Sequence, residues 1–219
     1  MKSKYVYIAD RELFENSSLK DPICLMDHNL NLIYPDFYRT NYDLKLIATK
    51  APTKEEKSMP VYNDYREKYG CSDISIIDSA VAAAESKNIF LNGFNQEQFE
   101  YIAPMIKETA EILYLFKCIK IHDLSALSQF KKIKGVFVFA NRALTSLWNM
   151  KNNEDLKIIS FVYVTKLQNI DALTESAVEY VNFDSSDLCG NKKEMLFDQS
   201  IFSKMPKIKH LFLEYKGKQ

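Results

Sequence analysis

The second half of the chain repeats one spacing of apolar residues: apolar, two residues, apolar, one residue, apolar. Five copies carry it, namely Leu113/Phe116/Cys118, Ile133/Val136/Val138, Leu156/Ile159/Phe161, Val178/Val181/Phe183 and Ile208/Leu211/Leu213. Their middle members, at positions 116, 136, 159, 181 and 211, are separated by 20, 23, 22 and 30 residues. No such unit can bury its apolar residues alone, whereas stacked units share one continuous core. The spacing therefore predicts a repeat architecture, with the strands of successive units in register as a parallel sheet.

The segments between the copies have patterns of their own. A weaker copy comes first, with Ser86, Ile89, Leu91 and Phe94 in the corresponding places. After it, Asn95 and Gln98 predict an N-terminal capping pair for a helix whose buried face is Phe99, Ile102 and Ile106. In the connections 121–133, 144–150 and 164–173, apolar residues recur at every third position. This period is typical of 3₁₀ turns or extended coil and not of an α-helix.

The stretches IKGVFVFANRALTSLW and LKIISFVYVTKLQNIDAL resemble bacterial leucine-rich repeat proteins of the internalin-like type. The resemblance covers about residues 86–216 and rests on spacing more than on identity. It implies an α/β fold: a solenoid with a short parallel sheet on the concave face and 3₁₀ turns or coil on the convex side. The family's asparagine is present at Asn141, and the positions we take as equivalent are Phe94, Ile121, Val164, Ser186 and Lys216.

Residues 1–85 lack the clear period of residues 86–219, and we predict a domain boundary there. Four stretches in them are expected strands: 5–8, 24–26, 30–34 and 44–48. A surface loop or linker is expected at 50–60 and a helix near 78–85. Because the first repeat of a solenoid needs a cap, residues 1–85 are interpreted as an N-terminal cap or small α+β region. The alternative is a separate functional module with its own pocket.

The residues that flank the apolar triplets would line the concave face of the sheet. Six of them form an apolar patch in its middle: Leu115, Ile119, Phe137, Phe139, Ile158 and Val162. Tyr180 and Phe212 extend this surface, Lys117, Asp184 and Glu214 form its rim, and Trp148 is expected to point outward at the lower edge. Large exposed apolar patches mark binding surfaces, so the pattern predicts a protein partner. The alternatives are that the N-terminal region covers the patch or that a second copy does, giving a homodimer.

Charge and composition exclude several classes of protein. Lys plus Arg and Asp plus Glu both number 29, so the net charge is zero, which disfavours a nucleic-acid partner. No apolar run reaches the roughly 20 residues of a membrane span, and the N-terminus does not read as a signal peptide, so we expect a cytoplasmic protein without membrane contact. The four cysteines form no CxxC pair, and the Cys24/His28 pair lacks the second pair that zinc requires. We expect free thiols and no metal or other cofactor.

These observations favour a non-catalytic protein–protein interaction module that binds its partner on the concave sheet face. A narrower alternative is a bacterial immunity or anti-toxin type of inhibitor that uses the same face. An alternative of another class is an enzyme, such as a hydrolase, with its site in the N-terminal region near Cys24, Asp27, His28 and Asp36.

Overall fold

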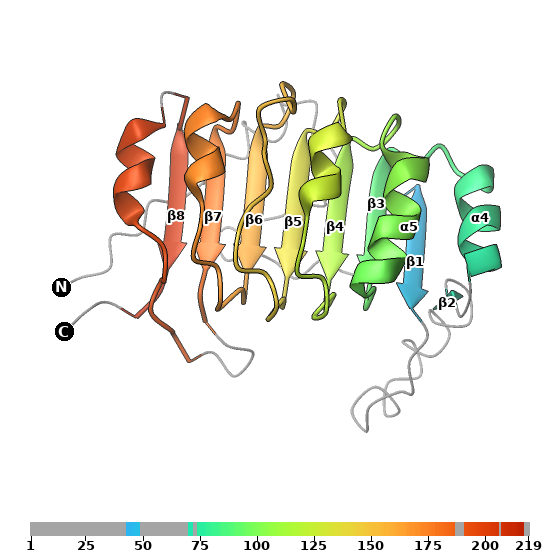
Figure 1. Ribbon diagram of the computed structural model, residues 1–219, viewed down its shortest axis with the longest axis horizontal. Helices are drawn as coiled ribbons and strands as arrows, with labels where there is room; N and C mark the ends of the chain where they lie inside the picture. Colours follow the sequence, from blue (N-terminus) through green and yellow to red (C-terminus); the bar gives the residue numbers. More distant parts are fainter. Residues whose placement is uncertain (1–42, 49–69, 72–73, 187–190, 206, 217–219) are drawn as a thin grey trace, which may run out of the picture.

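A computed structural model describes residues 43–48, 70–71, 74–186, 191–205 and 207–216. Its strands join in one sheet with the order β2-β1-β3-β4-β5-β6-β7-β8, and every neighbouring pair is parallel (Figure 1). The strands are β1 (Leu44–Ala48), β2 (Gly70–Cys71), β3 (Asn88–Asn92), β4 (Ile112–Phe116), β5 (Gly135–Phe139), β6 (Ile158–Val162), β7 (Tyr180–Asp184) and β8 (His210–Glu214). From β3 onward, strands that follow one another in sequence are neighbours in the sheet.

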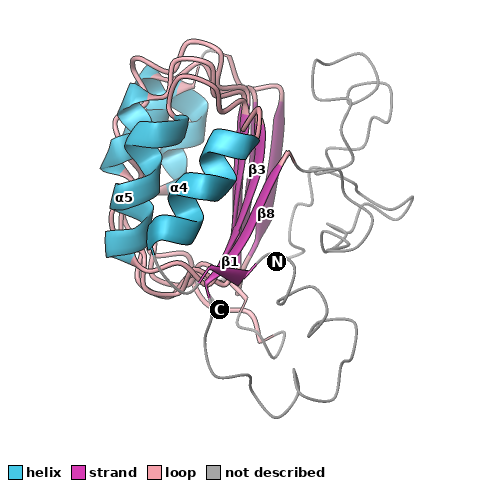
Figure 2. Cartoon of the chain, turned by 90° about the vertical axis from the view of Figure 1, so that its right-hand side faces the viewer, coloured by secondary structure: helices cyan, strands magenta, loops and turns pink. Residues whose placement is uncertain are grey.

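The helices lie on one side of this sheet (Figure 2). They are α4 (Ile74–Ala83), α5 (Gln96–Ile106) and the 3₁₀ helices η2 (Ser125–Gln129), η3 (Asp171–Glu175) and η4 (Gln199–Lys204). The prediction of an α/β fold with a parallel sheet is confirmed. None of the helices in the described part of the chain is long and apolar enough to cross a membrane.

Helix α5 begins where the sequence predicts. The Asn95 side chain accepts a hydrogen bond from the Gln98 amide at 2.9 Å, and the Asn95 amide donates to the Gln98 side chain at 3.0 Å. This capping box satisfies two amides that a helix start otherwise leaves without partners. The predicted apolar face of Phe99, Ile102 and Ile106 is fully buried against the sheet.

The apolar period of three corresponds to 3₁₀ geometry in two of the three connections between strands. In η2, the amides of Leu127 and Phe130 donate to the carbonyls three residues earlier, at 2.9 and 3.0 Å. In η3, Leu173 bonds Ile170 in the same way. Every third residue then faces the sheet. The connection at 144–150 has no helix and runs as extended coil, bridged at Ser146 to Asn169. Helix α4 begins four residues before the helix expected near 78–85.

The main core lies between the sheet and the helices, and it corrects the register of the first repeat copy. Leu113 and Leu115 pair with the core residues Val136 and Val138, whereas Phe116 faces the opposite side of the sheet. The first triplet is therefore Ala110, Leu113 and Leu115, and the predicted triplet 113/116/118 was wrong. All five residues of β4 are apolar, so alternation along this strand carries no information about which face is buried.

The four units of β3 to β6 each turn away from the sheet through one left-handed residue. Gly93, Lys117, Ala140 and Tyr163 have φ values of 72°, 51°, 57° and 58° at corresponding positions after their strands. Three of their amides donate to a carbonyl of the next strand: Gly93 to Phe116, Lys117 to Phe139 and Ala140 to Val162. Left-handed geometry is disfavoured for residues with a Cβ, and the interstrand hydrogen bond holds it in place.

Asn141 fastens one turn to the next. Its Nδ2 donates to the carbonyls of Cys118 and Ile121, each at 2.8 Å, and its Oδ1 accepts from the amides of Ala143 and Leu144. In the corrected register the preceding unit has Cys118 at this position, and the assignment of Ile121 was wrong. The Cys118 thiol lies 3.4 Å from the Leu91 carbonyl, so it also donates a hydrogen bond to the neighbouring unit, where Asn141 donates two.

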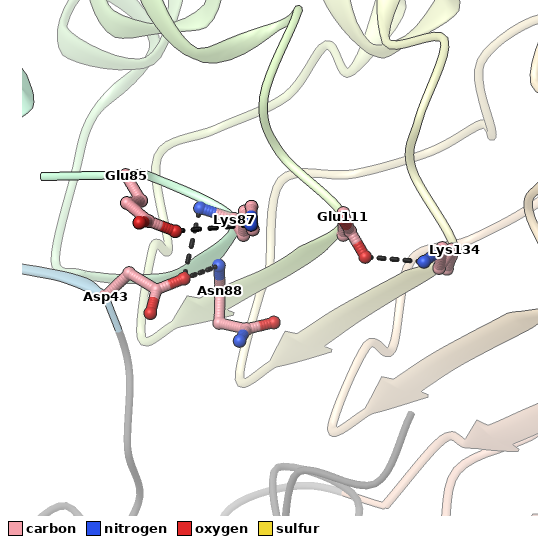
Figure 3. A network of polar contacts seen from close by, with 6 residues as sticks. All are labelled: Asp43, Glu85, Lys87, Asn88, Glu111 and Lys134. Carbon is pink, nitrogen blue, oxygen red and sulfur yellow. Dashed lines mark hydrogen bonds and ion pairs between the residues drawn. The ribbon is translucent and has the colours of Figure 1, made fainter. Parts of the chain in front are cut away.

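A row of charges precedes the strands along the opposite edge of the sheet. Lys87, Glu111, Lys134, Lys157, Glu179 and Lys209 stand directly before β3 to β8. Lys134 pairs with Glu111, and Glu179 pairs with both Lys157 and Lys209. At the β1 end, the Asp43 carboxylate accepts hydrogen bonds from the amides of Lys87 and Asn88, and Lys87 pairs with Glu85 (Figure 3). The lysines of this edge are therefore neutralised within the chain.

Candidate interaction surface

The sheet face opposite the helices carries a second buried cluster, which we call the aromatic face. Its members are Phe90, Ile112, Tyr114, Phe116, Phe137, Phe139, Ala140, Ile158 and Tyr180. They alternate along the strands with the residues of the main core. The rings stack from strand to strand, with centroids 5.5 Å apart for Phe90 and Tyr114 and 4.8 Å apart for Phe116 and Phe139. Aromatic pairs at such distances stabilise beyond the burial of their area.

Most of the predicted partner-binding residues lie on this face. Phe137, Phe139, Ile158 and Tyr180 belong to the aromatic face, and Val162 packs against it. Asp184, Glu214 and Phe212 share its side by strand register, because Asp184 pairs with Glu214 and Asn182 pairs with Phe212.

Four predicted residues lie elsewhere. Leu115 is fully buried in the main core, so its placement on the outer face was wrong. Lys117 and Ile119 lie in the exposed turn after β4 and not on the sheet. Trp148, expected to point outward, is only 3% exposed and packs in the main core.

The register error also hid two aromatic residues of the site, Tyr114 and Phe116, whereas Phe90 lies on the correctly registered β3 and was not among the predicted binding residues. Phe90, Tyr114 and Phe116 form the part of the aromatic face carried by β3 and β4. The sequence contains the signal that identifies them. A pattern anchored on Ala110 instead of Leu113 gives the same spacing of 23 residues to the next unit, and it places Tyr114 and Phe116 outward.

The aromatic face is not an open patch in the chain as a whole. Phe137 is 3% exposed and Phe139 is 5% exposed, so the expectation that these rings face solvent was wrong. The interpretation of residues 1–85 as a cap, or as the cover of this face, falls largely outside the described residues. In the described part, β1 and α4 belong to this stretch, and β1 pairs directly with β3.

The strands β6 and β7 give the same face a polar portion. Asn182 Nδ2 donates to the Ser160 hydroxyl at 2.8 Å. Asn182 Oδ1 is buried, as is Asn92 Nδ2 on β3, and neither atom has a hydrogen-bond partner among the described residues. A buried polar atom left unpaired costs about 1–3 kcal/mol. Asn182 Oδ1 and Asn92 Nδ2 therefore leave this sheet face with one acceptor and one donor that the described residues do not bond.

Asp184 adds a buried carboxyl group beside Asn182. Burial raises its pKa, against hydrogen bonds from the hydroxyl and the amide of Ser186 that lower it. The neighbouring Glu214 raises the pKa of Asp184 further, although Glu214 itself pairs with Lys192 at 2.9 Å. This end of the face therefore combines a desolvated acid with an amide oxygen that has no hydrogen-bond partner among the described residues.

The described residues contain no group of three His, Cys, Asp or Glu side chains that could hold a metal ion. Cys118 is buried in the core, and His122 is exposed in a turn. The residues of the enzyme alternative, Cys24, Asp27, His28 and Asp36, lie outside the described ranges. Comparison of the sequence with models of protein families and with curated proteins finds no match. The basis for a function is therefore the chemistry of the chain's own residues.

Proposed function

We propose that the chain is a non-catalytic, leucine-rich-repeat-like interaction module, which binds a polypeptide segment of a partner protein on its aromatic face. The repeat assignment is supported by the hydrogen bonds of Asn141 to the turn before it. It is also supported by Cys118 at the equivalent place, because leucine-rich repeats carry Asn or Cys there. Strands in register at a near-constant spacing agree with the same assignment.

The observation that carries the proposal is a pair of buried amide atoms at the two ends of the aromatic face, Asn92 Nδ2 and Asn182 Oδ1, that have no hydrogen-bond partner among the described residues. Asn92 lies on β3 and Asn182 on β7, which are four strand steps apart. At about 4.8 Å per step the span is roughly 19 Å. About six residues of extended polypeptide cover this distance. Such a segment offers apolar side chains to the rings and backbone donors and acceptors to both amides.

The burial of the face sets a condition on binding. Phe137, Phe139 and Asn182 are each at most 5% exposed, so a partner reaches them only by replacing the groups that now bury them. The exchange is favourable when the incoming segment satisfies Asn182 Oδ1 and Asn92 Nδ2, for which the described residues offer no partner. Hydrogen bonding then gives the face its selectivity, and the rings supply buried apolar area.

The proposal is tested by affinity capture from lysate of the source cell with the full chain, followed by measured affinities for the purified captured protein. Asn182→Ala removes the acceptor Oδ1, together with the hydrogen bond to Ser160, without adding charge, and we expect it to weaken binding about tenfold. The double variant Phe137→Glu/Phe139→Glu is expected to abolish binding.

Met105→Glu, on the exposed side of α5, is the matched control and is expected to bind like the wild type. Circular dichroism melts separate lost binding from lost folding. The proposal fails if Asn182→Ala binds the captured protein with wild-type affinity. It also fails if every captured protein binds both the Asn182 variant and the Phe137/Phe139 double variant as tightly as it binds the wild type.

A further inference from the structure

Positively charged side chains at the two edges of the sheet differ in whether they form ion pairs. Before the strands, Lys87, Lys134, Lys157 and Lys209 each form an ion pair with a glutamate. After the strands, four exposed cations stand in three consecutive turns: Lys117, Lys120, Arg142 and Lys166. We call them the basic strip. In the part of the chain that the structure describes, no carboxylate forms an ion pair with any of the four.

The turns that carry the strip lie side by side. Lys117 follows β4, Arg142 follows β5 and Lys166 follows β6, and these strands are neighbours. The Lys117 amide donates to the Phe139 carbonyl at the end of the next strand. Neighbouring strands are about 4.8 Å apart, so the three turns that carry these cations start within roughly 10 Å of one another along the edge.

The strip also borders the aromatic face. The Lys117 ammonium group lies 5.5 Å from the centre of the Phe116 ring, which belongs to that face. Ile119, between two cations of the strip, is 41% exposed and is among the few large apolar side chains open to solvent in the described residues. The nearest acid in sequence, Asp123, accepts two hydrogen bonds from Ser125 and is engaged within its own turn.

We infer that the basic strip docks an acidic polypeptide segment of the partner protein, next to the segment that occupies the aromatic face. The inference rests on the proposed function for the class of partner, a polypeptide, and adds the charge that the partner must carry. Complementary charge at the rim of an interface steers association and excludes wrong partners. A single row of four cations on a chain with zero net charge is narrow for a nucleic acid, which is bound by broader basic surfaces.

The test measures fluorescence anisotropy of a labelled 20-residue polyglutamate peptide with the full chain. The strip variant reverses all four charges: Lys117→Glu, Lys120→Glu, Arg142→Glu and Lys166→Glu. The control variant changes net charge equally at exposed lysines elsewhere: Lys131→Glu, Lys132→Glu, Lys151→Glu and Lys204→Glu. We expect the strip variant to raise Kd at least about tenfold and the control to stay within about threefold, with binding that weakens as salt is added.

Two results would overturn the inference. One is an equal loss of peptide binding in the strip and control variants, which would show a general charge effect. The other is tighter, strip-dependent binding of a single-stranded 20-nucleotide DNA than of the peptide, which would assign the strip to nucleic acid. The variant Asn182→Ala is expected to bind polyglutamate normally. Failure at the strip is therefore distinguishable from failure of the aromatic face.

Discussion

The indole of Trp148 donates a hydrogen bond from Nε1 to Oδ1 of Asn153 at 2.8 Å, inside the main core. Asn153 in turn donates from Nδ2 to the carbonyls of Leu127 and Phe130, both at 2.9 Å. The pair thus joins the return after β5 to the return after β4. A buried tryptophan needs a partner for its N–H, and Asn153 supplies it while closing two carbonyls of the neighbouring unit.

Replacing Trp148 by Phe keeps an aromatic ring but leaves Asn153 Oδ1 buried without its donor. We expect the free energy of unfolding in urea to fall by about 2–4 kcal/mol, from the lost bond and the smaller ring. Trp148 is the only tryptophan of the chain. Wild-type fluorescence should therefore be that of a buried indole and resist quenching by acrylamide. A readily quenched emission, with no loss of stability in the variant, would contradict the buried placement.

Asn141→Ala removes four hydrogen bonds at once and leaves the carbonyls of Cys118 and Ile121 without their donor. Each buried bond contributes about 1 kcal/mol, so we expect a loss of about 3–4 kcal/mol in chemical unfolding. Asn152→Ala, at an exposed position nearby, is the control and should change stability by less than about 0.5 kcal/mol. Equal changes in the free energy of unfolding for the two variants would contradict the hydrogen bonds of Asn141 between the turns.

Ser86→Ala is expected to stabilise the protein. The hydroxyl of Ser86 is buried and has no hydrogen-bond partner among the described residues, in a position that other units fill with apolar side chains. Removing an unsatisfied hydroxyl while keeping Cβ should raise the free energy of unfolding by about 1 kcal/mol. Both residues carry the same penalty for the φ of 51°, so backbone strain cancels in the comparison. A destabilised variant would show that the hydroxyl is bonded in solution.

The stability gained from Asp184→Asn should depend on pH. Burial raises the pKa of Asp184 in the folded protein. Folding therefore favours the neutral acid, and the ionised group costs stability at pH values above its folded-state pKa. Asparagine should stabilise the protein at neutral pH, and the gain should fade as pH falls through the folded-state pKa towards the unfolded one. Urea unfolding of the wild type and the variant at pH 7 and pH 3 measures the difference in the free energy of unfolding. A larger gain at pH 3 than at pH 7 would contradict the expected pH dependence.

The sequence predicts the α/β class, the parallel register and the start of α5, because each depends on local chemistry. Asn95 and Gln98 sit three residues apart at the head of an apolar helical face, and this arrangement has few other uses. The units from β5 to β7 are correctly registered because a large apolar residue stands three positions before the first core residue, as with Ile133 and Val136, whereas the β4 unit has the small Ala110 there.

The register of β4 could not be predicted from its own residues. Its sequence is apolar at all five positions, and pairing with β5 is what assigns Leu113 and Leu115 to the core. Anchoring the pattern on Leu113, three residues after Ala110, displaced Leu115 to the outer face and Cys118 into the triplet. The same step removed two rings, Tyr114 and Phe116, from the predicted aromatic face.

The position of Trp148 and the burial of the aromatic face depend on contacts between distant residues. Trp148 was expected to point outward because Ser128 and Asp171, which we took as its equivalents in other units, are polar. Instead, Asn153, five residues later, accepts a hydrogen bond from the indole N–H. For Phe137, alternation assigns the correct face of the sheet and says nothing about whether that face meets solvent. Burial of a sheet face is a property of the whole chain, which a strand's own pattern does not contain.

The register of the central strands has a consequence for how this chain could change in length. Gly135 is the register partner of both Ile112 and Ile158, so one unit from β4 to β6 takes 23 residues each time (135 − 112 and 158 − 135). The units of β4 to β6 end in the same left-handed turn, and the amides of Lys117 and Ala140 in these turns donate to the next strand. A tandem duplication of residues 135–157 would therefore add a strand without disturbing the ends. The molecule can be lengthened or shortened by whole units, widening or narrowing its sheet by one strand at a time.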